Sequence, residues 1–363
     1  MEKRKQIQDE ALEAVRPHLR AGVGMSMGSG KTLVGLKHML ENLKPNSKFL
    51  VVAPKTAVFK TWKDEADKFG MSHLMKHVTF TTYRSLVKQS LDYSVVYLDE
   101  CHSLLFSHDY FLARFIGKIL GLTGTPPKNA SSEKGKMVDK YCPIVFTYET
   151  DEAVEDKILN DYRILVHCID LDVRRNLMVG NNKKFVSSEK ASYEYWTRRI
   201  DEASRENDLR MSRIMRMKTM MTYPSKANYA KKLLEKINDK VILFANTTEQ
   251  ADSFNIPTYH SSNSKSEENF EKFQTGEVMQ LATVLQLNEG INVRNLKQGI
   301  IMHAYGNERK ASQRIGRLLR LNPDDQSKIH ILCYRNTIDE VWVKEALQDF
   351  DQTKISWYHI PNF

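Results

Sequence analysis

Ser26-Met27-Gly28-Ser29-Gly30-Lys31-Thr32 is the stretch of sequence that indicates the fold most directly. Its small glycines allow successive backbone N–H groups to face a phosphate, and the lysine and threonine add a cation and a hydroxyl beside them. Met25 stands where the strict form of this pattern has glycine, so an ordinary turn is the alternative interpretation. The predicted nucleotide-binding residues of this loop are Gly28, Ser29, Gly30, Lys31 and Thr32, with the Thr32 hydroxyl as a ligand of Mg²⁺.

Helical and strand patterns alternate around this loop. Apolar runs of strand length occupy residues 49–54, 78–82, 95–98 and 119–122, and helical spacing occupies residues 5–20, 33–43 and 57–69. The run before the loop, residues 21–25, is only a weak strand candidate. The pattern restarts with strands at 241–244, 281–284, 299–302 and 329–332, after a mainly helical stretch at 186–238. Apolar strands that alternate with helices predict parallel sheets covered on both faces, and therefore an α/β fold.

The composition is that of a soluble globular protein. The 363 residues suggest two domains, and 41% of them are hydrophobic while 27% are charged. No apolar stretch approaches the roughly 18 residues of a membrane span, and the charged N-terminus lacks the apolar run of a secretory signal. The four cysteines are scattered without a C-x-x-C pair, which argues against a zinc ribbon or a disulfide framework. We therefore expect a cytoplasmic protein without a membrane partner.

The positive charge of the chain is concentrated in its middle. Residues 173–240 hold 17 Lys or Arg and 8 Asp or Glu, which accounts for the whole net charge of +9. Basic residues with interleaved aromatics suit a polyanion, because cations contact phosphates and rings stack on bases. A solvated helical face is the alternative interpretation of such a charge run.

Two further motifs suit a nucleotide site. Asp99 and Glu100 follow the apolar run at 95–98, at the strand end where α/β sheets bind ligands, although an acidic pair in an exposed loop is the alternative. Asp99 would hold Mg²⁺, and Glu100 would orient and deprotonate the attacking water. Near the C-terminus, Arg317 and Arg320 share a helix face and would stabilise a transferring phosphate, unless they belong to an ordinary basic surface helix.

In order and spacing, the motifs resemble those of superfamily 2 helicases and translocases of the DEAH/DExH branch. The resemblance covers roughly residues 5–130 and 240–345, and any one motif alone is weak. Besides the phosphate loop and Asp99-Glu100-Cys101-His102, the similar segments are Val51-Val52-Ala53-Pro54-Lys55 with Trp62, Thr81-Thr82-Tyr83, Thr123-Gly124-Thr125-Pro126, Phe244-Ala245-Asn246-Thr247, Asn288-Glu289-Gly290-Ile291-Asn292 and Gln313 to Arg320.

The resemblance implies two tandem RecA-like parallel-sheet domains with a helical basic insert between them. It places the first domain at 1–150, the crossover and insert at 151–240, and the second domain at 241–363. It implies ATP and Mg²⁺ as cofactors, with Gln313, Arg317 and Arg320 completing the catalytic site from the second domain. Further implied ATP-binding residues are Gln8 at the adenine, Gly290 and Asn292, and the implied coupling residues are His102, Thr123 and Thr125.

The resemblance also implies contacts to nucleic acid. Those from the domain loops are Pro54, Lys55, Thr82, Tyr83 and Thr247. We expect the basic insert to add phosphate contacts through Arg198, Arg199, Arg213 and Arg216. The alternative is a pair of packing helices with solvated charges.

These features together favour an ATP-dependent DNA helicase or translocase. The Leu122-Thr123-Gly124-Thr125-Pro126 spelling resembles DNA motors, so DNA (single-stranded, forked or branched) is the expected partner and RNA the alternative. The short chain is typical of compact phage helicases, which suggests replication, recombination or repair. A nucleotide-gated clamp without net translocation and an unrelated phosphate-loop kinase are the other classes, and a monomer is the expected state.

Overall fold

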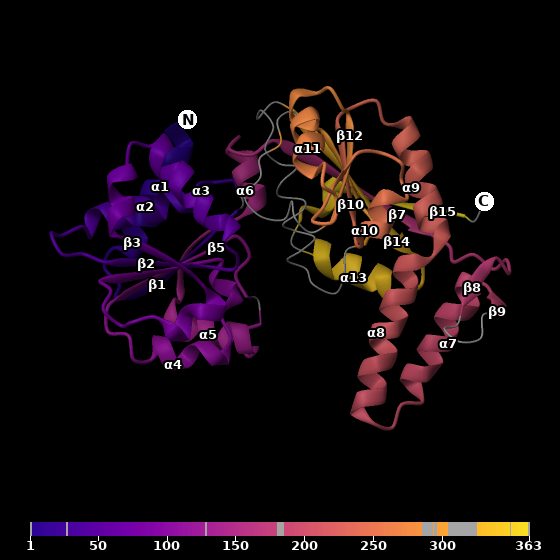
Figure 1. The fold of residues 1–363 in the computed structure, drawn as a ribbon, viewed down its shortest axis with the longest axis horizontal. Helices are drawn as coiled ribbons and strands as arrows, with labels where there is room; N and C mark the ends of the chain where they lie inside the picture. The colour runs from indigo at the N-terminus through magenta and orange to yellow at the C-terminus, as the bar shows by residue number, and fades with distance from the viewer. Residues whose placement is uncertain are drawn as a thin grey trace. The chain divides into compact units, whose positions relative to one another are not determined.

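The computed structural model of the chain describes residues 2–26, 28–127, 129–179, 185–284, 293, 296–303, 325–348 and 350–361. The chain divides into two units, of which the first ends at Asp161 and the second begins at Tyr162. Each unit has its own parallel β-sheet with helices packed around it (Figure 1). The predicted α/β fold with two parallel sheets is therefore confirmed.

The sheet of the first unit has six strands in the order β3-β2-β4-β5-β1-β6, and all neighbouring pairs are parallel. Most side chains of its central strands are buried on both faces, as expected for a sheet covered by helices on both sides. The strands are β1 (Arg20–Met25), β2 (Phe49–Ala53), β3 (Val78–Thr82), β4 (Val95–Asp99), β5 (Lys118–Thr123) and β6 (Ile144–Tyr148).

Helices cover both faces of this sheet. Figure 1 shows α1, α2 and α3 on one side and α4 and α5 on the other. The α-helices are α1 (Glu2–Val15), α2 (Lys31–Glu41), α3 (Ala57–Lys68), α4 (Asp109–Leu112), α5 (Glu133–Tyr141) and α6 (Thr150–Glu155). The short 3₁₀ helices are η1 (Ser72–His77), η2 (Tyr83–Lys88), η3 (Cys101–Ser103) and η4 (Phe106–His108).

Strand β1, which precedes the phosphate loop, has a weak sequence signal for a steric reason. A Cβ atom at Gly22 would lie 2.4 Å from the carbonyl oxygen of Cys142, so the neighbouring backbone leaves no room for a side chain. Glycine lowers the strand propensity of a segment but permits this close approach. The strand is nevertheless buried between β5 and β6.

The sheet of the second unit has seven strands in the order β11-β12-β10-β13-β14-β7-β15. Strand β7 (Asp161–Ile169) pairs with β15 (Ile355–Ile360) in parallel, so a strand within the predicted crossover region 151–240 belongs to the second sheet. Along the chain, the basic helices therefore come after the first strand of the second unit and belong to that unit, whereas the prediction put them before its first strand. The other strands are β10 (Val241–Ala245), β11 (Thr258–Tyr259), β12 (Gln280–Val284), β13 (Gln298–Ile301) and β14 (Gln326–Tyr334).

The basic segment itself forms a short antiparallel pair, β8 (Leu177–Val179) and β9 (Phe185–Ser187), followed by three helices. Helices α7 (Glu189–Asp201) and α8 (Glu206–Thr222) lie side by side, as Figure 1 shows, and we call them the helical hairpin. Helix α9 (Pro224–Lys236) starts with proline, which suits a first helical turn, and packs Ala230 and Leu234 into the core of the second unit. Among the described residues, the remaining helices are α10 (Thr248–Asp252), α11 (Ser266–Thr275), α13 (Ile338–Leu347) and the 3₁₀ helix η6 (Gln352–Lys354).

The described ranges contain neither a membrane-spanning helix nor a cluster of metal-binding side chains. None of their helices is long and apolar enough to cross a membrane. In the same part of the chain, no three His, Cys, Asp or Glu side chains gather as a metal site would require.

Candidate active site and nucleic-acid interface

Most of the predicted site residues of the first unit lie at one edge of its sheet. The phosphate loop follows β1, Pro54 and Lys55 follow β2, Asp99 ends β4 and Thr123 ends β5. Because these strands are parallel, their carboxyl ends meet at the same edge, where open α/β sheets bind ligands. The topology thus gathers residues that are far apart in the sequence.

The phosphate loop has the backbone that such a loop requires. Gly28 and Gly30 have φ angles of +89° and +100°, a region that side chains other than glycine rarely occupy. Helix α2 begins at Lys31, so its unpaired N–H groups point toward the loop and favour an anion there. The Lys31 ammonium donates hydrogen bonds to the carbonyl oxygens of Met25 (3.0 Å) and Ser26 (3.4 Å), which holds the cation beside the loop.

Gln8 reaches the phosphate loop from helix α1. Its side chain is buried and its Nε2 donates a hydrogen bond to the carbonyl oxygen of Ser29 at 2.9 Å. A Cβ atom at position 30 would lie 2.2 Å from the same Nε2, so Gly30 is also required by this close packing. Gln8 is thus adjacent to the loop, and its contact with adenine stays a prediction.

Asp99 is buried and is held by two aromatic side chains. The indole Nε1 of Trp62 donates a hydrogen bond to Asp99 Oδ2 at 2.7 Å, and the Tyr83 hydroxyl donates to the backbone oxygen of Asp99 at 2.9 Å. Burial and, to a smaller extent, the neighbouring Glu100 raise the pKa of the Asp99 carboxyl to about 6, although the Trp62 hydrogen bond and Lys31 oppose this. A buried carboxylate beside a second one favours a nearby cation.

Trp62 is a site residue whose role the sequence did not predict. It lies on α3, an otherwise mainly polar helix, and its side chain is fully buried. A lone tryptophan in such a helix indicates the buried face but not the hydrogen-bond partner of the indole. The Tyr83 side chain is likewise buried and supports Asp99 from within the core, and the contact of Tyr83 with nucleic acid stays a prediction.

The predicted coupling residues contact one another. His102 Nδ1 lies 2.8 Å from Thr123 Oγ1 and 3.4 Å from Thr125 Oγ1, and the Thr125 N–H donates to Thr123 Oγ1 at 3.1 Å. Glu100 Oε2 is 3.3 Å from the same His102 nitrogen. Glu100 itself has φ +51°, an uncommon backbone state for a residue with a side chain, and such strain often occurs at functional sites. The end of β5 is thus linked to the acidic pair through His102.

The donors at this edge fit magnesium chemically. Mg²⁺ prefers hard oxygen ligands, and the Asp99 carboxylate and the Thr32 hydroxyl are of this kind. Asp99 is also buried beside Glu100, and a cation bound there would offset the negative charge of this pair.

Several predicted nucleic-acid residues lie where loops leave the sheets. Lys55 is exposed after β2, and half-buried Thr82 ends β3. Thr247 is exposed after β10, and its Oγ1 accepts a hydrogen bond from the Gln250 N–H at the start of α10. The side chain of Thr247 therefore has a capping function within the chain.

The arginines of the helical hairpin differ in exposure. Arg198 and Arg199 in the last turn of α7 and Arg213 on α8 are exposed. Arg216 is half-buried: its guanidinium lies 5.5 Å from the ring centre of Tyr193, and its Nη1 donates to Thr197 Oγ1 at 3.2 Å. Three of the four arginines that are predicted to contact phosphates are therefore exposed to solvent.

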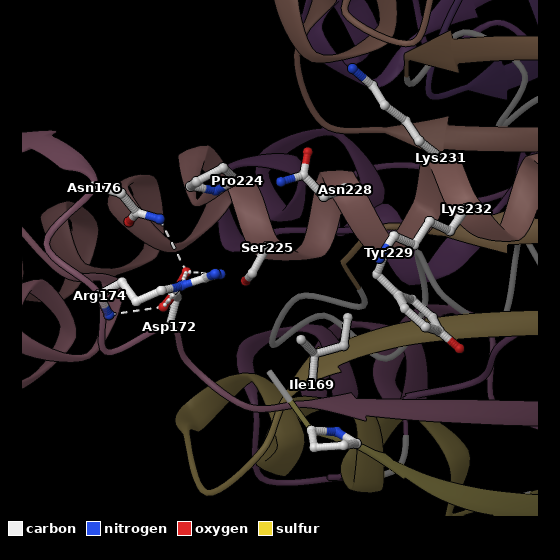
Figure 2. A pocket seen from close by; sticks show the side chains of 11 residues that line it. Ile169, Asp172, Arg174, Asn176, Pro224, Ser225, Asn228, Tyr229, Lys231 and Lys232 are labelled. Carbon is white, nitrogen blue, oxygen red and sulfur yellow. Dashed lines mark hydrogen bonds and ion pairs between the residues drawn. The ribbon is translucent and has the colours of Figure 1, made fainter. Parts of the chain in front are cut away.

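A cavity of about 330 Å³ lies at the root of the hairpin, beside the first turns of α9 (Figure 2). Arg174 and Asn176 face it, but both hydrogen-bond to the buried carboxylate of Asp172, which holds the pKa of that carboxyl at about 2. The buried carboxylate of Glu189 accepts the N–H and hydroxyl of Ser225 at the start of α9. The donors of Arg174, Asn176 and Ser225 are thus already bound to carboxylates, and Lys231 and Lys232 also line the cavity.

Five predicted site residues lie outside the described residues: Gly290, Asn292, Gln313, Arg317 and Arg320. Their roles stay predictions from sequence.

Two family models match the chain. The model described as "Type III restriction enzyme, res subunit" matches residues 2–128, and the model described as "Helicase conserved C-terminal domain" matches residues 225–322. Together they cover more than half of the chain. The first match contains the phosphate loop and the acidic pair, and the second begins in the first turn of α9.

Similar proteins include the DNA 3'-5' translocase XPB2 of Sulfurisphaera tokodaii, which is 25% identical over 357 residues, covering 90% of this chain and 80% of the relative. Among solved structures, the helicase domain of Pyrococcus furiosus Hef has a TM-score of 0.52 and matches 95% of this chain and 97% of that domain. The ATP-dependent Type ISP restriction-modification enzyme LlaBIII bound to DNA has a TM-score of 0.63 over 99% of this chain, which spans only 31% of that enzyme. Both structures are 14% identical to this chain, so they bear on the fold alone.

Proposed function

Because the chain belongs to the superfamily 2 helicases and translocases, which hydrolyse ATP and act on nucleic acid, we propose that it is an ATP-dependent DNA translocase or helicase. The observation that carries the proposal is the carboxyl edge of the first sheet. There the phosphate loop, the acidic pair and the His102–Thr123 contact follow neighbouring parallel strands.

In this proposal the first unit binds and activates ATP. The loop N–H groups and Lys31 bind the phosphates, and Asp99 and Thr32 hold Mg²⁺, which neutralises charge on the phosphates when bound. Glu100 orients the attacking water and accepts its proton, since a carboxylate beside the γ-phosphate is a suitable base. Because His102 contacts Glu100, Thr123 and Thr125, protonation of Glu100 during hydrolysis would alter the contacts of His102 with the two threonines at the end of β5.

The remaining charge stabilisation comes from Arg317, Arg320 and Gln313 in this proposal. Guanidinium groups that approach the γ-phosphate only in a closed state make hydrolysis depend on closure, and loss of the γ-phosphate then favours reopening. Gly290 and Asn292 would contact ATP from the same unit. In each cycle of ATP hydrolysis, the nucleic-acid contacts of one unit would move along the strand relative to those of the other unit.

DNA is the proposed substrate, with movement in the 3'–5' direction, as for the XPB2 relative. The exposed Arg198, Arg199 and Arg213 supply phosphate contacts, and Lys55 and Thr82 contact the strand from the first unit. Forked or branched DNA, in replication, recombination or repair, is the proposed setting.

The deciding measurement is the ATPase rate without nucleic acid and with single-stranded, duplex and forked DNA or RNA. We expect stimulation by DNA above that by RNA of equal length, together with displacement of a bound block from duplex DNA. Stimulation by RNA alone would refute the choice of DNA, and block displacement failing despite ATP turnover would favour a clamp.

A second measurement tests the hairpin. Arg198→Ala with Arg199→Ala should reduce the slope of log Kd against log salt by about one to two, because each phosphate contact contributes roughly 0.7 to 0.9. The control removes two exposed lysines of the first unit, Lys5→Ala with Lys76→Ala, which changes the net charge equally. Equal slopes in both variants would mean that the hairpin arginines do not contact phosphates.

A further inference from the structure

Lys226, in the first turn of α9, is a fully buried cation. Its ammonium donates a hydrogen bond to Asp339 Oδ2 at 2.5 Å, lies 2.9 Å from His303 Nδ1, and sits 4.4 Å from the ring centre of Tyr334. A buried charge is costly and is retained only with close partners, yet such pairs contribute little net stability compared with apolar packing. The buried Lys226–Asp339 ion pair therefore calls for an explanation other than stability.

We call these four residues the Lys226 cluster: Lys226, His303, Tyr334 and Asp339. They come from the ends of four segments at the carboxyl edge of the second sheet. His303 follows β13, Tyr334 ends β14, and Asp339 lies in the first turn of α13, where it also accepts the Tyr334 N–H at 3.0 Å. Burial alone would raise the pKa of the Asp339 carboxyl, but Lys226 and His303 more than offset this, so that pKa lies below its usual range and the carboxylate is charged.

The helical hairpin contacts the same segments at two points. The Tyr193 hydroxyl on α7 accepts a hydrogen bond from the Ile338 N–H at 2.9 Å, and Ile338 is the neighbour of Asp339. The buried carboxylate of Glu189, the first residue of α7, accepts the N–H of Ser225 at 2.8 Å, and Ser225 is the neighbour of Lys226. Both partners of the central ion pair are thus adjacent to a residue that the hairpin binds.

A chain of contacts leads from a predicted phosphate-binding residue, Arg216, to the Lys226 cluster. Arg216 lies over the Tyr193 ring, so a phosphate that binds its guanidinium would pull directly on the residue that holds the start of α13. At the other end, His303 immediately precedes residues 304–324, which contain Gln313, Arg317 and Arg320. Because a buried ammonium is costly to leave without its partners, we expect a displacement of Asp339 to move Lys226 and, with it, His303.

We propose that Lys226 is a positioning residue that, with Tyr193, Asp339 and His303, couples nucleic-acid contact on the helical hairpin to ATP hydrolysis. The proposal rests on the proposed function, since it assumes that DNA stimulates the ATPase. It adds a route within the second unit that lies outside the motifs of the sequence.

The test compares ATPase rates with and without saturating single-stranded DNA. Tyr193→Phe removes only the hydroxyl, and we expect the DNA-stimulated kcat to fall about three- to tenfold, a typical effect of residues that carry coupling. The rate without DNA and the Kd for DNA should stay within twofold of wild type. Tyr195→Phe is the matched control, because Tyr195 lies on the same helix but is exposed.

Lys226→Met alone leaves Asp339 buried and unpaired, so the second variant is Lys226→Met with Asp339→Asn, which removes both charges together. We expect the folded double variant to lose stimulation as Tyr193→Phe does. An unchanged ratio of stimulated to unstimulated rate in both variants would overturn the proposal, and so would an equal loss of both rates, which indicates a merely structural role. A wild-type ATPase that no nucleic acid stimulates would refute the proposed function itself, and the coupling with it.

Discussion

Trp62→Phe tests whether the indole N–H positions the acidic residue at the end of β4. The hydrogen bond from Trp62 Nε1 to Asp99 Oδ2 is 2.7 Å long, both side chains are buried, and the acceptor is charged. Hydrogen bonds to charged groups contribute about 1.5–3 kcal/mol, which corresponds to roughly a 10- to 150-fold change in an equilibrium. Because ligand-orienting partners typically change metal affinity by about 10- to 100-fold, we expect the half-saturating Mg²⁺ concentration to rise at least about tenfold.

The assay is the steady-state ATPase rate over a Mg²⁺ titration, together with the binding of a fluorescent ATP analogue in the presence and absence of Mg²⁺. Binding without Mg²⁺ should be nearly unchanged, since the Trp62 indole hydrogen-bonds to Asp99, which is predicted to hold Mg²⁺ and not the phosphates. Tyr97→Phe is the control, because it removes a buried hydrogen bond to His38 from the same core without touching Asp99. If folded Trp62→Phe protein shows the Mg²⁺ dependence of wild type, the indole does not position Asp99.

Glu100→Gln should keep ATP binding but reduce hydrolysis by at least about 100-fold, because the variant lacks the base that accepts the proton of the attacking water. The ATP-bound protein should then stay on DNA, which a gel-shift assay with ATP measures. Normal ATP turnover would exclude Glu100 as the base. Arg320→Ala should leave the Kd for ATP nearly intact and reduce kcat by about 10³-fold, and equal ATPase rates would remove Arg320 from the site. Burial lowers the pKa of His167 to about 4 and that of His330 to about 3, so both are neutral in the folded protein and take up protons on unfolding below about pH 6.5. Stability is therefore full above pH 6.5 and falls toward pH 4, by roughly 2 kcal/mol per histidine at pH 5. Thermal melts from pH 7.5 to 4.5 should show this loss, and His330→Gln should reduce it; a slope identical to that of wild type would contradict the assignment.

The strands that carry the site could be predicted from sequence because each is a continuous apolar run. The runs at 49–54 and 95–98 became β2 and β4, and the acidic pair follows β4 as expected. The sequence of strand β1 gave only a weak strand pattern, because the nearby Cys142 backbone leaves room only for glycine at position 22 and glycine has a low strand propensity. Periodicity describes local packing, so it could not show that β7 joins the second sheet by pairing with residues near the C-terminus.

Side-chain partners were harder to predict than strands. The contact of His102 with Thr123 is explained by their positions, since His102 follows β4 and Thr123 ends the neighbouring parallel strand β5, and their coupling role stays a prediction. The hydrogen bonds of Trp62 and Tyr83 to Asp99 join residues 37 and 16 positions apart, and no spacing rule indicates them. The burial of Lys226 is likewise a property of the tertiary structure.

The pairing of β7 with β15 has a consequence for how this chain can be divided. The helical hairpin is preceded by β7 and followed by α9 and β10, and both strands belong to the second sheet. It is therefore an insertion within one domain and not a linker between two domains. A fragment that starts at α9 would lack an interior strand of its sheet and would expose the edges of β14 and β15. A single cut in the turn at residues 202–205 would leave every strand in place, and the two pieces should remain associated.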